Sequence, residues 1–291
     1  MIAGLVLALA LLGGCESFIT KRAASSTFTI LEKSNIVAQR ESDLELARDA
    51  VPGGLMQLEA FALAYPDHDG FKRLHAEAFC SYAVAFVFDD WEDASLTGHT
   101  ADAERIAARL RPLLSRCAGL NRALLPKAWR EKPLAELVPL AKKAHAPILL
   151  WLATTGAVEL ALAPMANFSR LPEIRAALTR CVELAPGARN ADAELLLATL
   201  DAGTGAVFGT TDGKAAFDRA RTAAGPGALI VEVMFARGTA VARKDRSLFT
   251  TTLEKALAAD PAQWPDRRLA NELARRKARR YLAAIDALLP P

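Results

Sequence analysis

The chain has 291 residues, of which 24% are charged, and a formal net charge of only +3. Such a small charge gives no reason to expect nucleic acid or an anionic membrane surface as a partner. Hydrophobic residues make up 52% of the chain, enough to bury a substantial core. Ala, Leu and Arg are frequent and β-branched runs are scarce, which favours an all-α fold.

The first 14 residues form an apolar run without a charged side chain. This run is shorter than the roughly 20 residues that a membrane-spanning helix needs, and it is typical of a signal peptide. Leu12-Gly13-Gly14-Cys15 resembles the bacterial lipobox, which implies cleavage before Cys15 and lipidation of that residue. Because two or three acyl chains anchor a protein stably, we expect attachment to a membrane outside the cytoplasm. Residues 15–35, rich in Ser and Thr, are the expected tether.

Residues 36–291 are predicted to form one array of helices without a further domain boundary. Helices are expected over residues 36–50, 55–65, 71–88, 101–117, 134–144, 147–162, 171–184, 190–202, 228–242, 246–259 and 264–289. The break after residue 50 is expected because Pro52, Gly53 and Gly54 follow one another closely. The apolar helix at 71–88 should lie in the centre of the core, although its end at 84–88 also fits a strand.

A short pattern recurs four times: a large apolar residue, a second core position three residues later, and then a proline. The four copies are Leu58/Phe61/Pro66, Leu178/Cys181/Pro186, Phe217/Ala220/Pro226 and Leu253/Ala256/Pro261. Positions three apart share a helix face, and proline cannot continue a helix. Each copy therefore predicts the second helix of a hairpin that ends before its proline. The last two prolines lie 35 residues apart, close to the roughly 34-residue tetratricopeptide (TPR) period. The other copies break that period, so we expect an irregular TPR-like array.

Residues typical of catalysis or metal binding do not occur at the spacings that known catalytic or metal-binding motifs require. Gly209 and Gly213 are separated by three residues, whereas a phosphate-binding loop needs four, and Ala215 replaces its Ser or Thr. We interpret residues 203–214 as a loop between repeats. The four histidines, His68, His75, His99 and His145, show no zinc-binding spacing. We therefore expect no enzyme activity, no cofactor and no metal site.

Two charged segments and three further cysteines leave alternatives open. Asp89, Asp90, Trp91, Glu92 and Asp93 fit a solvated helix end or the lip of a ligand or partner site, since an aromatic residue among polar neighbours often serves there.

The basic residues of the last helix fit a solvated face or an electrostatic contact with a partner protein. Cys80, Cys117 and Cys181 are expected as three small buried residues, with one disulfide as the alternative that an oxidising compartment permits.

Four segments in order resemble the T-component family of tripartite ATP-independent periplasmic (TRAP) transporters. They are the G-K-x-x-F-x-x-A helix at 213–220, the D-R-x-x-F segment within 240–249, residues 253–261, and the R-L-x-N-x-x-A segment at 268–274. The Gly53-Gly54-Leu55 turn and the segment at 82–90 also occur in the family's order. The resemblance covers most of the chain after residue 36.

This resemblance implies a periplasmic lipoprotein of TPR-like fold that is not an enzyme. It implies association with the extracytoplasmic solute-binding protein of a TRAP transporter, and a homotrimer with a central pore that passes a small solute. Cys15 is the one family residue that carries over directly. Glu16 follows it in place of the Asp usually linked to inner-membrane retention, so we expect the outer membrane. The alternative hypothesis is a TPR adaptor lipoprotein for assembly of the cell envelope.

Overall fold

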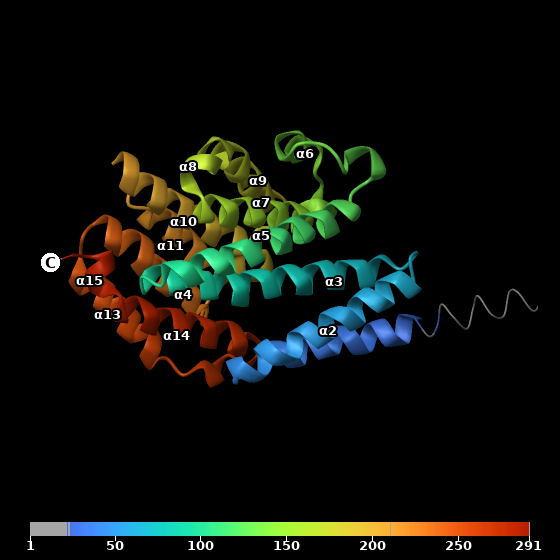
Figure 1. The fold of residues 1–291 in the computed structure, drawn as a ribbon, viewed down its shortest axis with the longest axis horizontal. Helices are drawn as coiled ribbons and strands as arrows, with labels where there is room; N and C mark the ends of the chain where they lie inside the picture. The colour runs from blue at the N-terminus through green and yellow to red at the C-terminus, as the bar shows by residue number, and fades with distance from the viewer. Residues whose placement is uncertain (1–21, 23, 210, 291) are drawn as a thin grey trace, which may run out of the picture.

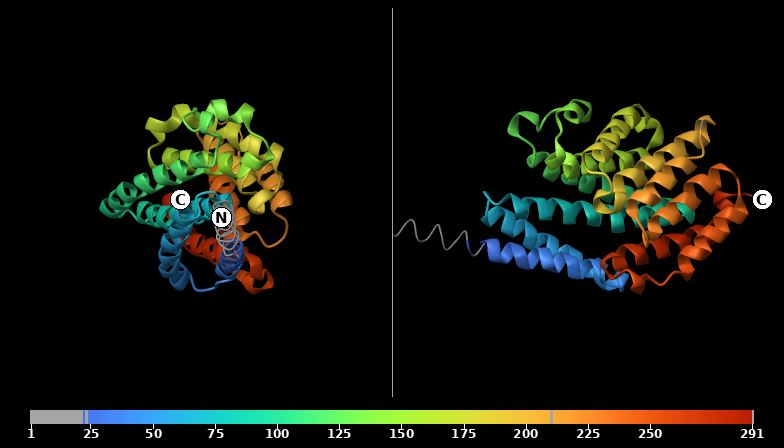
Figure 2. Two further views of the ribbon diagram at one scale, coloured as in Figure 1. Left: turned by 90° about the vertical axis from the view of Figure 1, so that its right-hand side faces the viewer. Right: turned by 180° about the vertical axis from the view of Figure 1, so that it is seen from behind.

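The computed structural model describes residues 22, 24–209 and 211–290 (Figure 1). Across these residues the chain folds into helices and forms no strand, which confirms the all-α prediction. Consecutive helices lie side by side, and the last helices return to the first ones. Figure 2 shows this return from behind, where the C-terminal helices lie beside the N-terminal ones.

The N-terminal part consists of long helices that pack against one another. A helix over residues 24–39 precedes α2 (Leu44–Ala64), α3 (Asp69–Tyr82), a π-helical segment η1 (Ala83–Phe88), α4 (Asp89–Leu96) and α5 (Thr100–Ala123). Because α3, η1 and α4 follow one another directly, they form one unbroken rod. The rod packs against α2 on one side and α5 on the other.

The middle part is organised around the buried helix α7 (Ala146–Leu162). This part also contains η2 (Lys127–Trp129), α6 (Leu134–Leu140), η3 (Lys143–His145), α8 (Pro164–Asn167), η4 (Phe168–Arg170), α9 (Leu171–Leu184) and α10 (Ala188–Phe208). One helical stretch, Lys143–Leu162, is long and apolar enough to cross a membrane by length and composition. Because 61% of that window is buried inside the protein, we interpret it as a core helix.

The C-terminal part contains α11 (Lys214–Ala224), α12 (Leu229–Phe235), a second π-helical segment η5 (Ala236–Ala240), α13 (Arg246–Ala258), η6 (Pro261–Gln263), η7 (Pro265–Arg267), α14 (Arg268–Ala283) and α15 (Ile285–Leu288). Its core holds Phe249, Leu253 and Tyr281, all fully buried. At the turn before α14, Asp266 Oδ1 accepts a 2.7 Å hydrogen bond from Arg40. This contact ties the end of the chain to its beginning.

The four predicted helix ends are confirmed. α2, α9, α11 and α13 stop shortly before Pro66, Pro186, Pro226 and Pro261, respectively. Seven of the eight apolar positions of the pattern are buried as expected, with Phe217, Leu178 and Leu253 completely inaccessible to solvent, whereas Phe61 is only partly buried.

The predicted break at residues 51–54 is wrong, because α2 continues through Pro52. The proline removes one backbone hydrogen bond. Burial of Ala47, Leu55 and Leu58 on both sides of it holds the helix together. The break lies earlier instead, where the Asp43 carboxylate caps α2 by accepting the N–H groups of Glu45 and Leu46 at 2.9 and 3.1 Å.

Ordered structure begins before residue 36, inside the segment expected to be a tether. The ring of Phe28 lies 5.5 Å from that of Phe71 and 5.0 Å from that of His68. These contacts fix the helix over residues 24–39 to the α2–α3 hairpin. The segment at 84–88 lies within a π-helix, so the strand alternative is excluded. α10 extends to Phe208, beyond the expected end near residue 202.

Candidate functional site

The acidic segment at 89–93 lies inside the long rod and faces the basic helix α14. Asp89 is only 1% exposed. Its carboxylate accepts hydrogen bonds from Arg280 at 2.7 and 3.1 Å and from Arg276, and it lies 2.7 Å from Lys277 Nζ. Three cations from one helix therefore surround one buried carboxylate from another.

Glu92 and Asp93 extend this network along the same face of α4. Glu92 accepts hydrogen bonds from Arg280 at 2.9 Å, from Lys277, and from the buried hydroxyl of Tyr281 at 2.6 Å. Asp93 lies 2.9 Å from Arg280 Nε at the exposed edge. We call these residues, Asp89, Glu92, Asp93, Arg276, Lys277, Arg280 and Tyr281, the α4–α14 network.

Asp90 and Trp91 point to other neighbours. Arg48 of α2 donates to both Asp90 oxygens, at 2.7 and 2.6 Å, and its guanidinium lies 5.5 Å from the centre of the Phe86 ring. Trp91 stacks on Phe88, with ring centres 5.4 Å apart. The segment is therefore not a solvated helix end. Its carboxylates are paired with cations of the neighbouring helices α2 and α14.

The sequence predicted that residues 89–92 form the lip of a ligand or partner site, and the geometry is compatible with only some of these residues. Asp89 is enclosed by the protein and is not accessible to a partner. A contact with a partner through Asp90, Trp91 or Glu92 stays a prediction. The interpretation of the basic residues of the last helix is corrected as well. Arg276, Lys277 and Arg280 bind carboxylates within the chain and are not a solvated face.

The charges of the α4–α14 network shift one another's pKa values. Burial on its own opposes ionisation of Asp89, but Lys277, Arg280 and Arg276 outweigh it and hold the pKa of Asp89 well below its usual range. Burial likewise disfavours the charged form of Arg280, but hydrogen bonding to Asp89 and the nearby acids raise its pKa. Burial and then Glu92 raise the pKa of Tyr281 well above 10. Asp89 and Arg280 are therefore charged, and Tyr281 is neutral, at neutral pH.

The low pKa of Asp89 predicts acid sensitivity. Below about pH 3.9 the unfolded chain binds a proton at Asp89, whereas the folded chain does not. The stability that the ionised Asp89 carboxylate contributes is therefore fully present above that pH and is lost as the pH falls further. Urea unfolding at pH 7, 4 and 3 should show a steeper acid loss of stability for the natural protein than for Asp89→Asn. Parallel curves for the two proteins would contradict the assignment.

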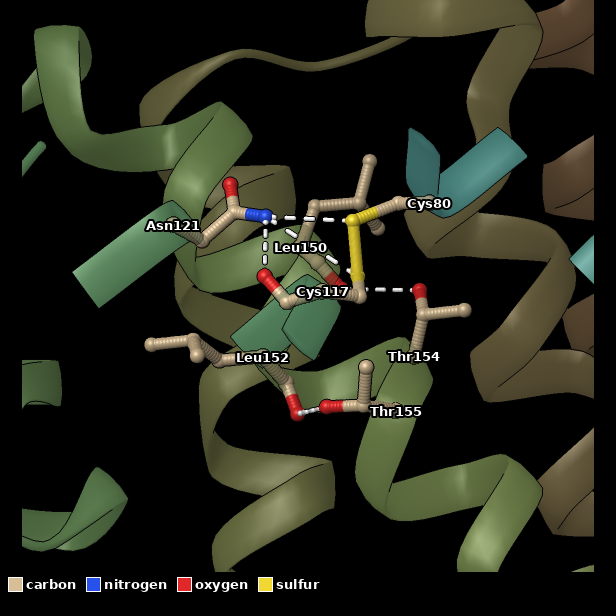
Figure 3. The surroundings of a disulfide bond; sticks show 7 residues. All are labelled: Cys80, Cys117, Asn121, Leu150, Leu152, Thr154 and Thr155. Atoms are coloured by element: carbon tan, nitrogen blue, oxygen red, sulfur yellow. Dashed lines mark hydrogen bonds between the residues drawn. A yellow bond between two sulfur atoms is a disulfide. The ribbon is translucent and has the colours of Figure 1, made fainter. Parts of the chain in front are cut away.

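A disulfide joins α3 to α5 between Cys80 and Cys117, whose Cα atoms are 5.2 Å apart (Figure 3). The side-chain amide of Asn121 lies beside it and donates to the Cys117 carbonyl at 3.0 Å and to Cys80 Sγ at 3.2 Å. The bond is packed against Leu55, Phe79 and Trp151. The expectation of three buried thiols is thus wrong for this pair.

Cys181 keeps its thiol, which is buried and donates to the Ala146 carbonyl at 3.4 Å. Burial, with a smaller effect of Glu194, raises its pKa to about 12. It is therefore an unreactive core residue. Cys15 lies outside the described residues. Within the described residues, no group of three or more His, Cys, Asp or Glu side chains is placed to hold a metal ion.

The fold and the α4–α14 network define an all-α protein whose N-terminal and C-terminal parts are joined by charged side chains. Residues 40–289 match the sequence model of the TRAP transporter T-component family, so the chain belongs to that family. No curated protein matches the chain. The protein is thus a component of a TRAP transporter, and the described residues form the all-α class of fold that the sequence predicted.

Proposed function

We propose that this TRAP transporter component is a non-enzymatic accessory subunit that docks the extracytoplasmic solute-binding protein. The observation that carries the proposal is the family match over residues 40–289, which covers nearly all of the helical array. The proposal extends to a TPR-like arrangement, because consecutive helices pack chiefly on their neighbours. It also includes a homotrimer with a pore that passes a small solute.

The disulfide supports a location in the periplasm. Structural disulfides persist in oxidising compartments and are rare in the bacterial cytoplasm. The Cys80–Cys117 bond is buried in the core, as expected of a structural rather than a transient disulfide. Together with the lipobox at Cys15, it supports a periplasmic protein anchored by lipid to the outer membrane.

The α4–α14 network suits a docking scaffold. Its ion pairs, such as that between Arg280 and Asp89, hold the rod against α14, which follows about 190 residues later in the chain. A scaffold held in this way presents a fixed surface, so that a partner meets an arrangement that is already formed.

The test is affinity purification of the protein from residue 16 onward against periplasmic extract, with the mass of each eluted complex measured by light scattering. Recovery of a TRAP solute-binding protein, particularly in a threefold assembly, supports the proposal. Recovery of envelope-assembly factors in its place supports the adaptor alternative. A monomer that elutes alone contradicts the proposed docking and the trimer.

A further inference from the structure

We infer that a groove along α9, beside α6, is the docking surface for an amphipathic helix of the partner protein, whose acidic end meets Lys142 and Lys143. The identity of that partner rests on the proposed function, whereas the groove and its chemistry do not. Two adjoining hollows of about 450 and 410 Å³ form the groove, and both are lined by Val138, Pro172 and Ala176. Its floor is therefore mainly apolar.

The groove has the length of a helix. Its lining residues on one side run from Ser169 in η4 to Glu183 near the end of α9. Fourteen helical steps span about 21 Å, so a straight helix of similar length fits along it. A helix bound in such a groove places apolar residues on it at every third or fourth position.

Exposed apolar side chains also occur on the elements that flank α9 in the chain. Eleven large hydrophobic residues are exposed within the described part of the chain, and five of them belong to α6, α8, η4 and α10: Leu140, Met165, Phe168, Val207 and Phe208. Phe168 directly precedes the groove residue Ser169, and its ring lies 5.8 Å from that of Phe208. Met165 is 93% exposed. The Phe168–Phe208 pair thus adds exposed apolar surface beside the groove, of the kind that interaction sites use.

The charges around the groove favour an acidic partner end. Arg170, Arg175 and Arg180 line it, but each already binds a carboxylate of the chain, namely Glu173, Asp201 and Glu183 respectively.

Lys142 and Lys143 differ from these arginines. They are exposed, and neither has an ion-pair partner within the described part of the chain. Arg180 donates to the Ala141 carbonyl at 3.1 Å, which holds the lysine turn at the end of the groove. The available positive charge is thus concentrated at one end.

The other six exposed hydrophobic residues lie within residues 30–63, on the N-terminal helix and α2. Figure 1 shows α2 on the side of the molecule opposite to α6, α8 and α9. This second apolar surface provides a matched control, because Ala60 on α2 and Ala176 on α9 are both exposed alanines within helices.

The experiment measures binding of the purified TRAP solute-binding protein to the full chain in mild detergent. Ala176→Glu should weaken binding at least tenfold, because a charged side chain then occupies the apolar floor. Lys142→Glu with Lys143→Glu should weaken it several-fold and reduce its salt dependence. Ala60→Glu should leave it unchanged, and all variants should keep the natural unfolding midpoint. Loss of binding with Ala60→Glu but not with Ala176→Glu would overturn the inference.

A second probe separates this inference from the proposed function. A phage-displayed library of 14-residue helical peptides is selected on the natural full chain. Selected peptides should carry acidic residues at one end and bind Ala176→Glu at least tenfold more weakly. If the solute-binding protein fails to bind but such peptides are found, the proposed identity of the partner is contradicted, while the groove is supported as a docking surface. The proposed groove would be overturned if the selected peptides bound the natural chain and Ala176→Glu equally, or if the selection yielded no peptide.

Discussion

Replacing Asp89 by alanine should destabilise the protein by about 3–5 kcal/mol, the cost of removing one partner from a buried ion pair. The variant would leave Arg276, Lys277 and Arg280 facing one another, with only Glu92 and the exposed Asp93 to balance their charge. Arg280 is 9% exposed and has little access to water in compensation. Urea unfolding followed by circular dichroism at neutral pH measures the loss.

Asp93→Ala is the matched control, because it removes a carboxylate from the same network at its exposed edge. The Asp93 side chain is 56% exposed, so its ion pair with Arg280 is screened by water and should contribute at most about 1 kcal/mol. Equal losses for the two variants would show that burial of Asp89 does not determine the strength of the network.

The helices could be predicted from the sequence because their signals are local. A proline after an apolar face ends a helix wherever the chain goes next, and α9, α11 and α13 follow that rule. The same local rule failed at Pro52. There the decisive contribution is packing of α2 against α3, which the residues around the proline do not reveal.

The partner of the acidic segment could not be predicted, because solvated and paired carboxylates have the same local sequence. A usable signal was nevertheless present. Asp89, Glu92 and Asp93 share one helix face by spacing, and so do Arg276, Lys277 and Arg280. Two faces of opposite charge on separate helices indicate a pair, but only the fold shows that residues about 190 positions apart meet.

The disulfide pairing shows the same limit. Three cysteines after Cys15 allow three different pairings or none, and their positions within helices favoured none. In the structure α3 and α5 are neighbours, which brings Cys80 and Cys117 together, while Cys181 lies on α9 in a different cluster. Tertiary packing of helices, and not the spacing of the cysteines, selects the pair.

Removing the disulfide with Cys80→Ala and Cys117→Ala together should cost about 4 kcal/mol. The bond closes a loop with a sequence separation of 37, and its main effect is to restrict the unfolded chain. The natural protein, unfolded in urea with and without a reductant, should show a similar difference, whereas the double variant should be insensitive to the reductant.

Cys181→Ala controls for the loss of a buried sulfur atom. This thiol is not bonded to another cysteine, so its removal should cost only about 1 kcal/mol and should leave the response to reductant intact. If the double variant were no less stable than Cys181→Ala, the bond would contribute nothing to the fold.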